Sequence, residues 1–376
     1  MAIIRVPEMM SRFGNLSKME VVAPVKIFSK VPTSGALDPS LAWDPLKKRV
    51  WMAYTSEDRT VTDIEALNVR LASADVKDGC KLWVRTEAGF NAKNDDILAP
   101  DGQTILRSGT WRTETPALVY DPDDHGREWK LYAYKYFWSN DPKSVMPVAR
   151  HYGVIVYKYA SDPEKEWSLE QWLFSPTEGY PPPPYEQMIL LHLNRLDPSL
   201  QNVATYARPS VIYKDGALIM TLSVFTDGLT PDRIIMIISR DHGNSWVYAG
   251  TVLQKSDLTA PYTEIAGASL VEQEGQVYLA AALGNEQQRG QGTVIFSFED
   301  LSKGLLQRDP KSGAPVVLNR IPLQNPNTGY IGGGTAAYSE ACGRGIMQTE
   351  QVGSSQLFQI YQTITKPIEI NPPGNK

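Results

Sequence analysis

The sequence contains few cysteines and few histidines, and both shortages limit the chemistry it can support. Its 376 residues include 2 Cys, Cys80 and Cys342, and 4 His. Two cysteines exclude a framework of several disulfides and leave room for one bridge. The histidines have no H-x-x-x-H spacing and there is no C-x-x-C, so the pattern predicts no zinc site.

Excess positive charge and long apolar runs are also missing. Lys and Arg number 37 against 42 Asp and Glu, which gives a formal net charge of -5. A general nucleic-acid binder carries a basic stripe, so nucleic acid is not an expected partner. No apolar run approaches the roughly 18 residues of a membrane span, so a membrane is not expected either.

Pro7 and Glu8 interrupt an N-terminal stretch too short for a signal-peptide core. We therefore expect a cytoplasmic protein or one whose leader has been removed.

What the sequence does contain is a weak repeat of β-rich segments. In five places a small or charged residue, often beside Pro, opens a short apolar strand, and a turn and a second strand follow. The five openings are Asp38, Thr115, Arg208, Gly267 and Thr335. Gly, Asp and Pro separate the strands as they do in hairpins. Units of about four strands with little helical periodicity predict a radial array of sheets.

The third unit carries the most specific motif of the repeat. Residues 239–246 read SRDHGNSW and fit the S-x-D-x-G-x-[ST]-W pattern of an Asp box, a hairpin turn of propeller blades. In this turn the Asp accepts backbone hydrogen bonds, the Gly allows a positive φ, and the Trp packs between neighbouring sheets. Asp241 is therefore predicted to have a structural role, remote from the channel mouth.

We predict a single-domain, all-β fold over residues 1–376: a five-bladed β-propeller with residues 1–20 and 371–376 peripheral. Because the last unit lacks one strand, Val21–Ser29 is predicted to join the fifth blade and close the ring. Cys80 and Cys342 fall in turns on one face of the neighbouring first and fifth blades, so a disulfide between them is geometrically conceivable. A β-sandwich, or two smaller β domains, is the alternative fold.

Candidate catalytic residues follow from the propeller geometry. The first strand of each blade lines the channel, and the residues that open these strands surround one mouth. Asp38, Glu114, Arg208 and Glu264 occupy such positions. Three carboxylates around one opening suit acid and base, or nucleophile, chemistry at a glycosidic bond. Arg208 would hold a carboxylate ionised or bind an anionic group of the substrate.

Each of these residues also has a structural alternative. Asp38 would cap a turn, Glu114 would pair with Arg112, Arg208 would form structural ion pairs, and Glu264 would lie on a solvated loop. Which of the two roles holds depends on whether the carboxylates meet at one pocket.

Four other residues fall near predicted mouth loops and are candidates for substrate contacts. Aromatic faces stack on sugar rings, and a histidine can approach the mouth from a third strand. The alternatives are packing between blades for the aromatic residues and a satisfied structural role for the histidine. The candidates are Trp111, His151, Tyr262 and Tyr330.

This layout resembles the five-bladed glycoside hydrolases, namely the arabinanase and xylosidase family forty-three and its invertase and levansucrase relatives. In those enzymes the first inner strand opens with an Asp that is base or nucleophile, commonly in Asp-Pro, and Asp38-Pro39 matches. The second blade supplies a further acid, and Glu114 is the nearest match. The family's proton donor would fall where this chain has Arg208, so Glu264 is the expected substitute.

The resemblance implies a hydrolase for a poly- or oligosaccharide, with a secreted or extracytoplasmic location and no required cofactor. A structural calcium ion stays an open alternative that no ligand spacing demands. The Asp box also resembles sialidases, whose arginine triad cannot be placed here. A function of another class, non-catalytic recognition of a glycan or protein through the same mouth, is the main alternative.

Overall fold

The computed structural model describes residues 24–29, 35–58, 66–99, 101–139, 150–178, 185–226, 230–286, 290–323, 336–352 and 357–368. This part of the chain is all-β, and its helical elements are single 3-10 turns. None of these turns in the described residues is long or apolar enough to cross a lipid bilayer. The turns are η1 (Val76–Asp78), η2 (Tyr185–Met188), η3 (Leu193–Arg195), η4 (Pro198–Leu200), η5 (Lys255–Asp257), η6 (Leu301–Lys303) and η8 (Glu340–Cys342).

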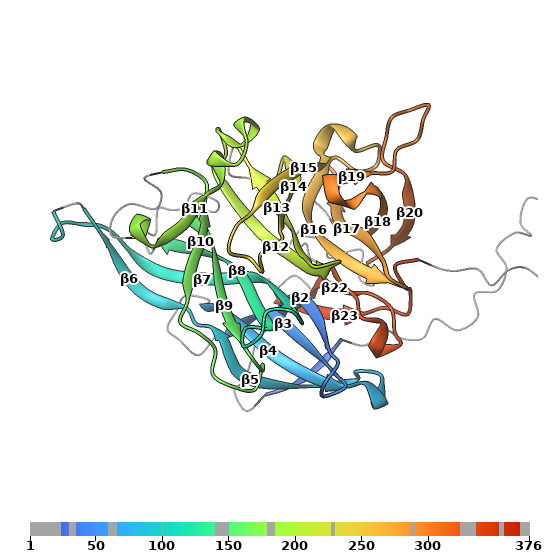
Figure 1. Ribbon diagram of the computed structural model, residues 1–376, viewed down its shortest axis with the longest axis horizontal. Helices are drawn as coiled ribbons and strands as arrows, with labels where there is room; N and C mark the ends of the chain where they lie inside the picture. Colours follow the sequence, from blue (N-terminus) through green and yellow to red (C-terminus); the bar gives the residue numbers. More distant parts are fainter. Residues whose placement is uncertain are drawn as a thin grey trace, which may run out of the picture.

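The strands of the described residues form five curled sheets that follow one another along the chain (Figure 1). The first sheet has the order β1-β5-β4-β3-β2 and the second β11-β10-β9-β8-β7-β6. Strands of the first sheet are β1 (Lys26–Phe28), β2 (Gly35–Asp44), β3 (Arg49–Asp58), β4 (Ala66–Asp75) and β5 (Leu82–Phe90). Strands of the second are β6 (Lys93–Leu98), β7 (Ile105–Tyr120), β8 (Trp129–Ser139), β9 (Arg150–Ala160), β10 (Gln171–Ser175) and β11 (Ile189–His192).

The three remaining sheets repeat the same meander. The third has the order β12-β13-β14-β15, the fourth β16-β17-β18-β19 with β20 also on β18, and the fifth β21-β22-β23. Their strands are β12 (Thr205–Lys214), β13 (Ala217–Phe225), β14 (Arg233–Ser239), β15 (Val247–Gln254), β16 (Glu264–Gln273), β17 (Gln276–Gly284), β18 (Gly290–Asp300), β19 (Leu305–Leu306), β20 (Val317–Ile321), β21 (Ala336–Ala337), β22 (Met347–Val352) and β23 (Leu357–Gln362). The inner hairpins predicted from the repeat are therefore present.

Both faces of the central strands are buried, which explains their nearly continuous hydrophobic sequences. On β3, Trp51 and Ala53 belong to a core shared with the second sheet, whereas Val50, Met52 and Tyr54 face the fifth sheet. Because successive side chains on a strand point to opposite faces, one strand serves two cores. The described residues form five such cores: between sheets one and two, two and three, three and four, four and five, and five and one.

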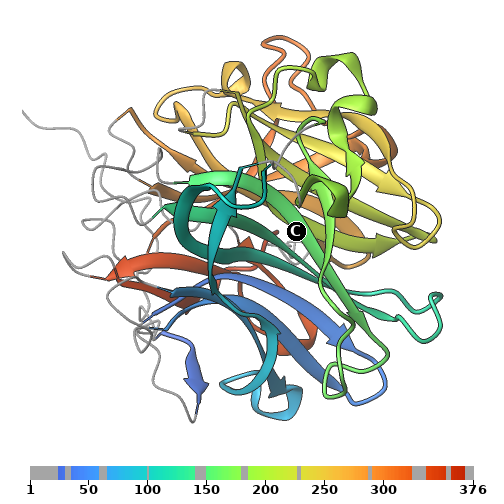
Figure 2. The ribbon, with the colours of Figure 1, turned by 90° about the vertical axis from the view of Figure 1, so that its left-hand side faces the viewer.

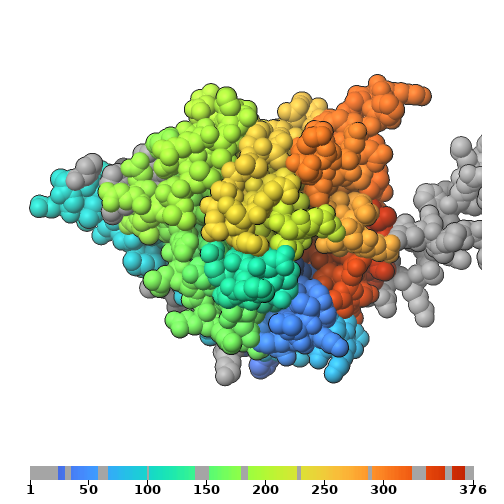
Figure 3. All heavy atoms as spheres, viewed as in Figure 1, coloured from blue at the N-terminus to red at the C-terminus, as the bar shows by residue number. Residues whose placement is uncertain are grey.

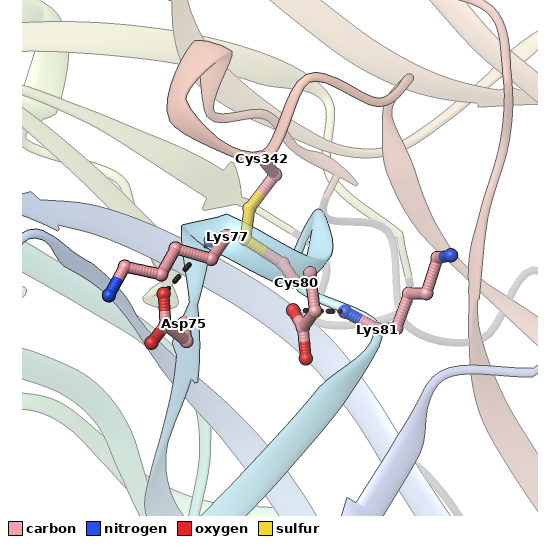
Figure 4. Close-up of a disulfide and its surroundings, with 6 residues drawn as sticks. Asp75, Lys77, Cys80, Lys81 and Cys342 are labelled. Atoms are coloured by element: carbon pink, nitrogen blue, oxygen red, sulfur yellow. Dashed lines mark hydrogen bonds between the residues drawn. A yellow bond between two sulfur atoms is a disulfide. The ribbon is translucent and has the colours of Figure 1, made fainter.

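The first and fifth sheets, although at opposite ends of the chain, lie side by side (Figures 1 and 2). A disulfide bond joins these two sheets (Figure 4). It links Cys80, just after η1, to Cys342, at the end of η8. The predicted topology allowed this bond. Asp75 caps η1 by accepting a hydrogen bond from the backbone N–H of Lys77. Both cysteines are buried within the core shared by the two sheets.

The N-terminal segment is placed differently from the prediction for Val21–Ser29. Pro24 does bridge Tyr361 of the fifth sheet, and the N–H of Val25 donates to the carbonyl of Ile360 at 2.8 Å. The following strand β1, however, pairs in parallel with β5 of the first sheet. The described part of this segment thus contacts both sheets instead of adding wholly to the fifth.

One hairpin extends beyond the repeat. Strand β7 begins ten residues earlier than the predicted opening at Thr115, and its first half pairs with β6. The resulting hairpin stands out from the body of the molecule at the left of Figures 1 and 3. The second sheet is therefore the widest of the five, because β11 also adds in parallel to β10.

The turn between β14 and β15 is organised by Asp241. One carboxylate oxygen accepts hydrogen bonds from the Ser239 hydroxyl and the Ser245 backbone N–H, both at 2.8 Å, and the other accepts the Ser245 hydroxyl at 2.6 Å. Partial burial raises the pKa of Asp241, but the hydrogen bonds from Ser245 and Ser239 outweigh it and hold the pKa below its usual range. Trp246 then packs against Tyr132 and Phe174 of the second sheet.

We expect the paired substitution Cys80→Ser with Cys342→Ser to lower the free energy of unfolding by about 2–4 kcal/mol. The bond closes a loop with a sequence separation of 262 residues, which restricts the unfolded chain. Urea unfolding of the non-reduced proteins measures the difference. Equal midpoints for the variant and the wild type would show that the bond contributes nothing to stability.

Asp241→Ala is expected to destabilise the protein by about 1 kcal/mol at neutral pH, since it leaves turn donors without their acceptor. Because the pKa of Asp241 is lowered on folding, this difference should shrink as the pH falls through that pKa. Arg240→Ala, at an exposed neighbouring position, is the matched control and should be neutral. The structural role is wrong if both variants unfold at the wild-type denaturant concentration.

Candidate active site

The innermost strands of the first three sheets share a β-bulge directly before a proline. Ladder registers shift between Leu37 and Ser40, between Glu114 and Ala117, and between Ala207 and Ser210. The bulged residues have positive φ angles: 54° at Asp38, 52° at Thr115 and 53° at Arg208. Non-glycine residues rarely adopt this conformation, least of all β-branched ones such as Thr. Backbone strain of this kind clusters at functional sites.

These bulges lie at one end of a central cavity. The innermost strands of all five sheets contribute to the wall of this cavity, whose volume is about 490 Å³. Pro39, Pro116 and Pro209 line it, whereas the residue before each proline does not. Since consecutive Cα atoms are about 3.8 Å apart, Asp38, Thr115 and Arg208 lie just beyond the same end of the cavity. The sequence prediction that the strand openings converge is consistent with this arrangement.

Asp38 is held between neighbouring sheets by two threonines. Its side chain and backbone are almost fully buried, with 1% exposure. The Asp38 backbone N–H donates to Thr349 Oγ1 of the fifth sheet at 2.8 Å. The Thr55 hydroxyl donates to Asp38 Oδ2 at 3.1 Å and accepts the backbone N–H of Thr115 at 2.9 Å. A continuous set of hydrogen bonds therefore connects the fifth, first and second sheets at this end of the cavity.

Glu114 enters the same region from the second sheet. It immediately precedes Thr115 in β7, is buried, and accepts a hydrogen bond of 3.4 Å from the Tyr136 hydroxyl at Oε2. Its neighbour Arg112 places its guanidinium 4.2 Å from the ring centroid of Trp138. The Thr55 hydroxyl therefore links the backbone next to Glu114 to the carboxylate of Asp38.

The third predicted carboxylate is placed less favourably for catalysis than those of Asp38 and Glu114. Glu264 is the first residue of β16, and its Oε2 lies 2.8 Å from Nζ of Lys255. The two groups form an ion pair, but their geometry is not that of a hydrogen bond. Arg208, on β12, is partly buried at the third bulge.

Trp111 lies in the core, where its side chain is 2% exposed. Its ring makes edge contacts with Phe137, Trp172 and Tyr185, at centroid distances of 5.2, 5.0 and 5.2 Å. This placement favours the packing alternative over direct contact with a sugar.

Tyr262 is also mostly buried, at 8% exposure. Its hydroxyl accepts a hydrogen bond of 2.9 Å from Arg320, whose guanidinium lies 5.1 Å from the ring centroid. The backbone of His151 lies in β9 opposite Phe137. Tyr330 lies outside the described residues.

Two buried acids near this end were not among the predicted site residues. Glu57, the penultimate residue of β3, lies opposite Gly35, and a Cβ on Gly35 would meet the Glu57 carboxylate. Glu350 follows Thr349 in β22 and accepts a hydrogen bond of 2.9 Å from Gln348 at Oε1. The available signal was a Thr followed within two residues by an acid in the second strand of a unit.

Within the described residues, no group of three or more His, Cys, Asp or Glu side chains is arranged to hold a metal ion. The carboxylates of Asp38, Glu114 and Glu350 accept hydrogen bonds from hydroxyl and amide groups.

Sequence comparison finds no matching family model and no matching curated protein. Comparison of structures finds glycoside hydrolases. A protein of the GH130 family of mannoside phosphorylases, described as containing glycoside hydrolases that target β-1,2 mannosidic linkages in Candida mannan, has a TM-score of 0.53 and 13% identity, covering 98% of each chain. A glycosyl hydrolase from Bacteroides ovatus has a TM-score of 0.48 and 11% identity, covering 88% of this chain and 84% of that one. Zg3597, a family 117 glycoside hydrolase from Zobellia galactanivorans, has a TM-score of 0.46 and 11% identity, covering 93% and 91%.

At these identities the likeness concerns the fold. The first comparison extends over nearly the whole of both chains, so this chain shares its all-β architecture with a carbohydrate-active protein. The bulges, the buried acids and their hydrogen bonds belong to this chain and carry the argument about its site.

Thr55→Val should lower the free energy of unfolding by about 1–3 kcal/mol, because it leaves the buried Asp38 carboxylate and the Thr115 N–H without their shared hydroxyl. Thr221→Val is the matched control: Thr221 is equally buried, and its hydroxyl has no hydrogen-bond partner among the described residues. Denaturant unfolding of both variants gives the comparison. A cost for Thr55→Val no larger than that for Thr221→Val would contradict the proposed link.

Proposed function

We propose that the chain is a glycoside hydrolase-like enzyme on a closed five-bladed β-propeller. In this proposal it cleaves glycosidic bonds of a poly- or oligosaccharide at the end of the cavity where the three bulges meet. The observation that carries the proposal is the set of hydrogen bonds through Thr55, which links the carboxylate of Asp38 to the backbone beside Glu114.

The propeller interpretation is supported by packing that runs in a cycle. Innermost strands contact one another in the order β2, β7, β12, β16, β21 and back to β2. The five shared cores follow the same cycle, including the one between the last and first sheets. A β-sandwich has two sheets whose outer faces lie in solvent. Neither the cycle of strand contacts nor the five shared cores fits that arrangement. The Ser239–Trp246 turn, with its central Asp241 and inserted Trp, supports its assignment as an Asp box.

The roles of the two principal acids follow from their surroundings. Asp38 is the proposed base or nucleophile: Thr55 and Thr349 orient it, and the strained backbone fixes its position at the cavity. Glu114 is the proposed proton donor, with the Tyr136 hydroxyl orienting its carboxyl group. A hydrolytic site of this kind needs one carboxylic acid and one carboxylate across the scissile bond. We propose that Arg208 is their electrostatic partner, where it can balance the charge of Asp38 or of the substrate.

Glu264 remains the second candidate for the acid. Its ion pair with Lys255 makes it a weaker choice, since its carboxylate already contacts an ammonium group. His151, Tyr262 and Tyr330 are proposed as peripheral substrate contacts. Trp111 is left out of the proposed site because its ring packs in the core.

The structural relatives suggest which substrates to try first. β-1,2-linked mannosides are named for the GH130 protein, and phosphorolysis is named beside hydrolysis. Trial reactions should therefore include β-1,2-mannobiose with and without inorganic phosphate, followed by arabinan and xylan oligosaccharides. The anomer of the product, read by proton NMR, then distinguishes retention from inversion.

Asp38→Asn and Glu114→Gln should each lower kcat/KM by about 10²–10⁴-fold on whichever glycoside the wild type cleaves, with unchanged folding by circular dichroism. Glu299→Gln, an exposed change elsewhere on β18, is the control and should keep full activity. Comparing Glu264→Gln with Glu114→Gln identifies the acid.

Unchanged turnover in Asp38→Asn would end the assignment of Asp38. A wild-type protein that binds these oligosaccharides without cleaving them would instead establish the non-catalytic alternative, recognition of a glycan through the same mouth.

A further inference from the structure

The opposite end of the central cavity carries a ring of aromatic side chains. Trp43, Tyr120 and Tyr213 line it, each the same number of residues after the bulged residue of its strand. Tyr338, just after β21, joins them from the fifth sheet. Trp43 is 38% exposed, so this end of the cavity opens to the surface. We refer to these four residues together with Glu340 as the aromatic end.

The charge of the cavity wall has one sign. Every residue that lines the cavity belongs to the part of the chain that the structure describes. Two of these residues, Glu272 and Glu340, carry a negative charge, and none is Lys, Arg or His. Glu272 lies 2.8 Å from the ammonium group of Lys214, which neutralises it. Glu340 is exposed and accepts a hydrogen bond from the backbone N–H of Glu274. Within the described residues no cation forms an ion pair with Glu340.

Carboxylates also lie near the hydroxyl groups of two of these tyrosines. Burial raises the pKa of Tyr338 to about 12, and the charges of Glu340 and Glu274 act in the same direction. A hydrogen bond to Asp123 is the main cause that raises the pKa of Tyr213 to about 12, with burial and the charge of Asp123 adding to it. Carboxylates near the hydroxyl groups of these two tyrosines thus add negative charge to this end of the cavity.

We propose that the aromatic end binds an organic cation, an ammonium group on a small apolar body. The faces of Trp and Tyr attract such a group through their quadrupoles, and quaternary ammonium ions are recognised in this way by aromatic cages. Glu340 supplies a complementary charge at the opening, and the Pro, Ala and Leu side chains of the wall suit the apolar body. A cavity of about 490 Å³ accommodates a small ligand.

This site is separate from the proposed catalytic end. The bulged residues lie at the other end of the cavity, so the two sites do not share Asp38, Glu114 or Arg208. An anionic ligand would be repelled by Glu340, and a neutral sugar would gain nothing from the negative potential. The negative charge of Glu340 therefore favours a cationic ligand over an anionic or a neutral one.

The test compares choline with its neutral isostere 3,3-dimethylbutan-1-ol on the full chain, by saturation-transfer NMR and by tryptophan fluorescence. Choline should bind at least about 5-fold more tightly than the neutral analogue, and Trp43→Ala should weaken choline binding by about 3-fold or more. Glu340→Gln, a change at an exposed position that leaves folding intact, should reduce the preference for choline. Glu299→Gln is the matched carboxylate control and should bind choline as the wild type does.

Three results would overturn the proposal: equal affinity for choline and the neutral analogue, no binding of choline to the folded wild type, or displacement of choline by glucose or mannose at comparable concentrations. Loss of choline binding in Asp38→Asn would also contradict it, because that residue lies at the other end of the cavity. Since none of these measurements requires turnover, the outcome is independent of the catalytic proposal.

Discussion

Each sheet of this protein is packed on both faces, and the rest of the structure depends on that constraint. A strand such as β3 sends Trp51 toward one neighbour and Met52 toward the other, so no sheet can be removed without exposing two cores. Burial of apolar area on both sides provides the dominant stabilisation. The buried disulfide between Cys80 and Cys342 adds a covalent link where the ends of the chain meet. Packing of this kind brings one strand edge from every sheet to a common centre.

That centre is chemically different at its two ends. At one end, bulges before Pro39, Pro116 and Pro209 place Asp38, Thr115 and Arg208 in strained backbone conformations, beside buried acids and bridging threonines. At the other end the same strands present aromatic rings and an exposed carboxylate. The packing of each sheet on both faces holds this strained backbone in place. The fold is shared with a carbohydrate-active protein, but what each end of the cavity can bind depends on its own residues and not on the fold.

The sequence predicted much of the fold because its signals are local. Alternation within hairpins, prolines after strand openings and the SRDHGNSW turn each depend on a few neighbouring residues. It failed where the partner is distant, since β1 pairs with β5 and not with the fifth sheet. It also could not decide between the two roles of Trp111, whose ring packs against Trp172 and Tyr185. The site shows the same division. Asp38 and Glu114 stand out by position, whereas Thr55 gains its significance from its contact with the backbone of Thr115 in the second sheet.

The most direct test of the central claim is a crystal structure of the inactive Asp38→Asn protein soaked with an oligosaccharide that the wild type cleaves. The account predicts a sugar at the bulged end of the cavity, flanked by the side chains of residues 38 and 114. Their carboxyl and amide carbons should lie about 5–5.5 Å apart for a retaining enzyme or about 6.5–9.5 Å apart for an inverting one. A sugar bound elsewhere, or side chains that point away from each other, would contradict it.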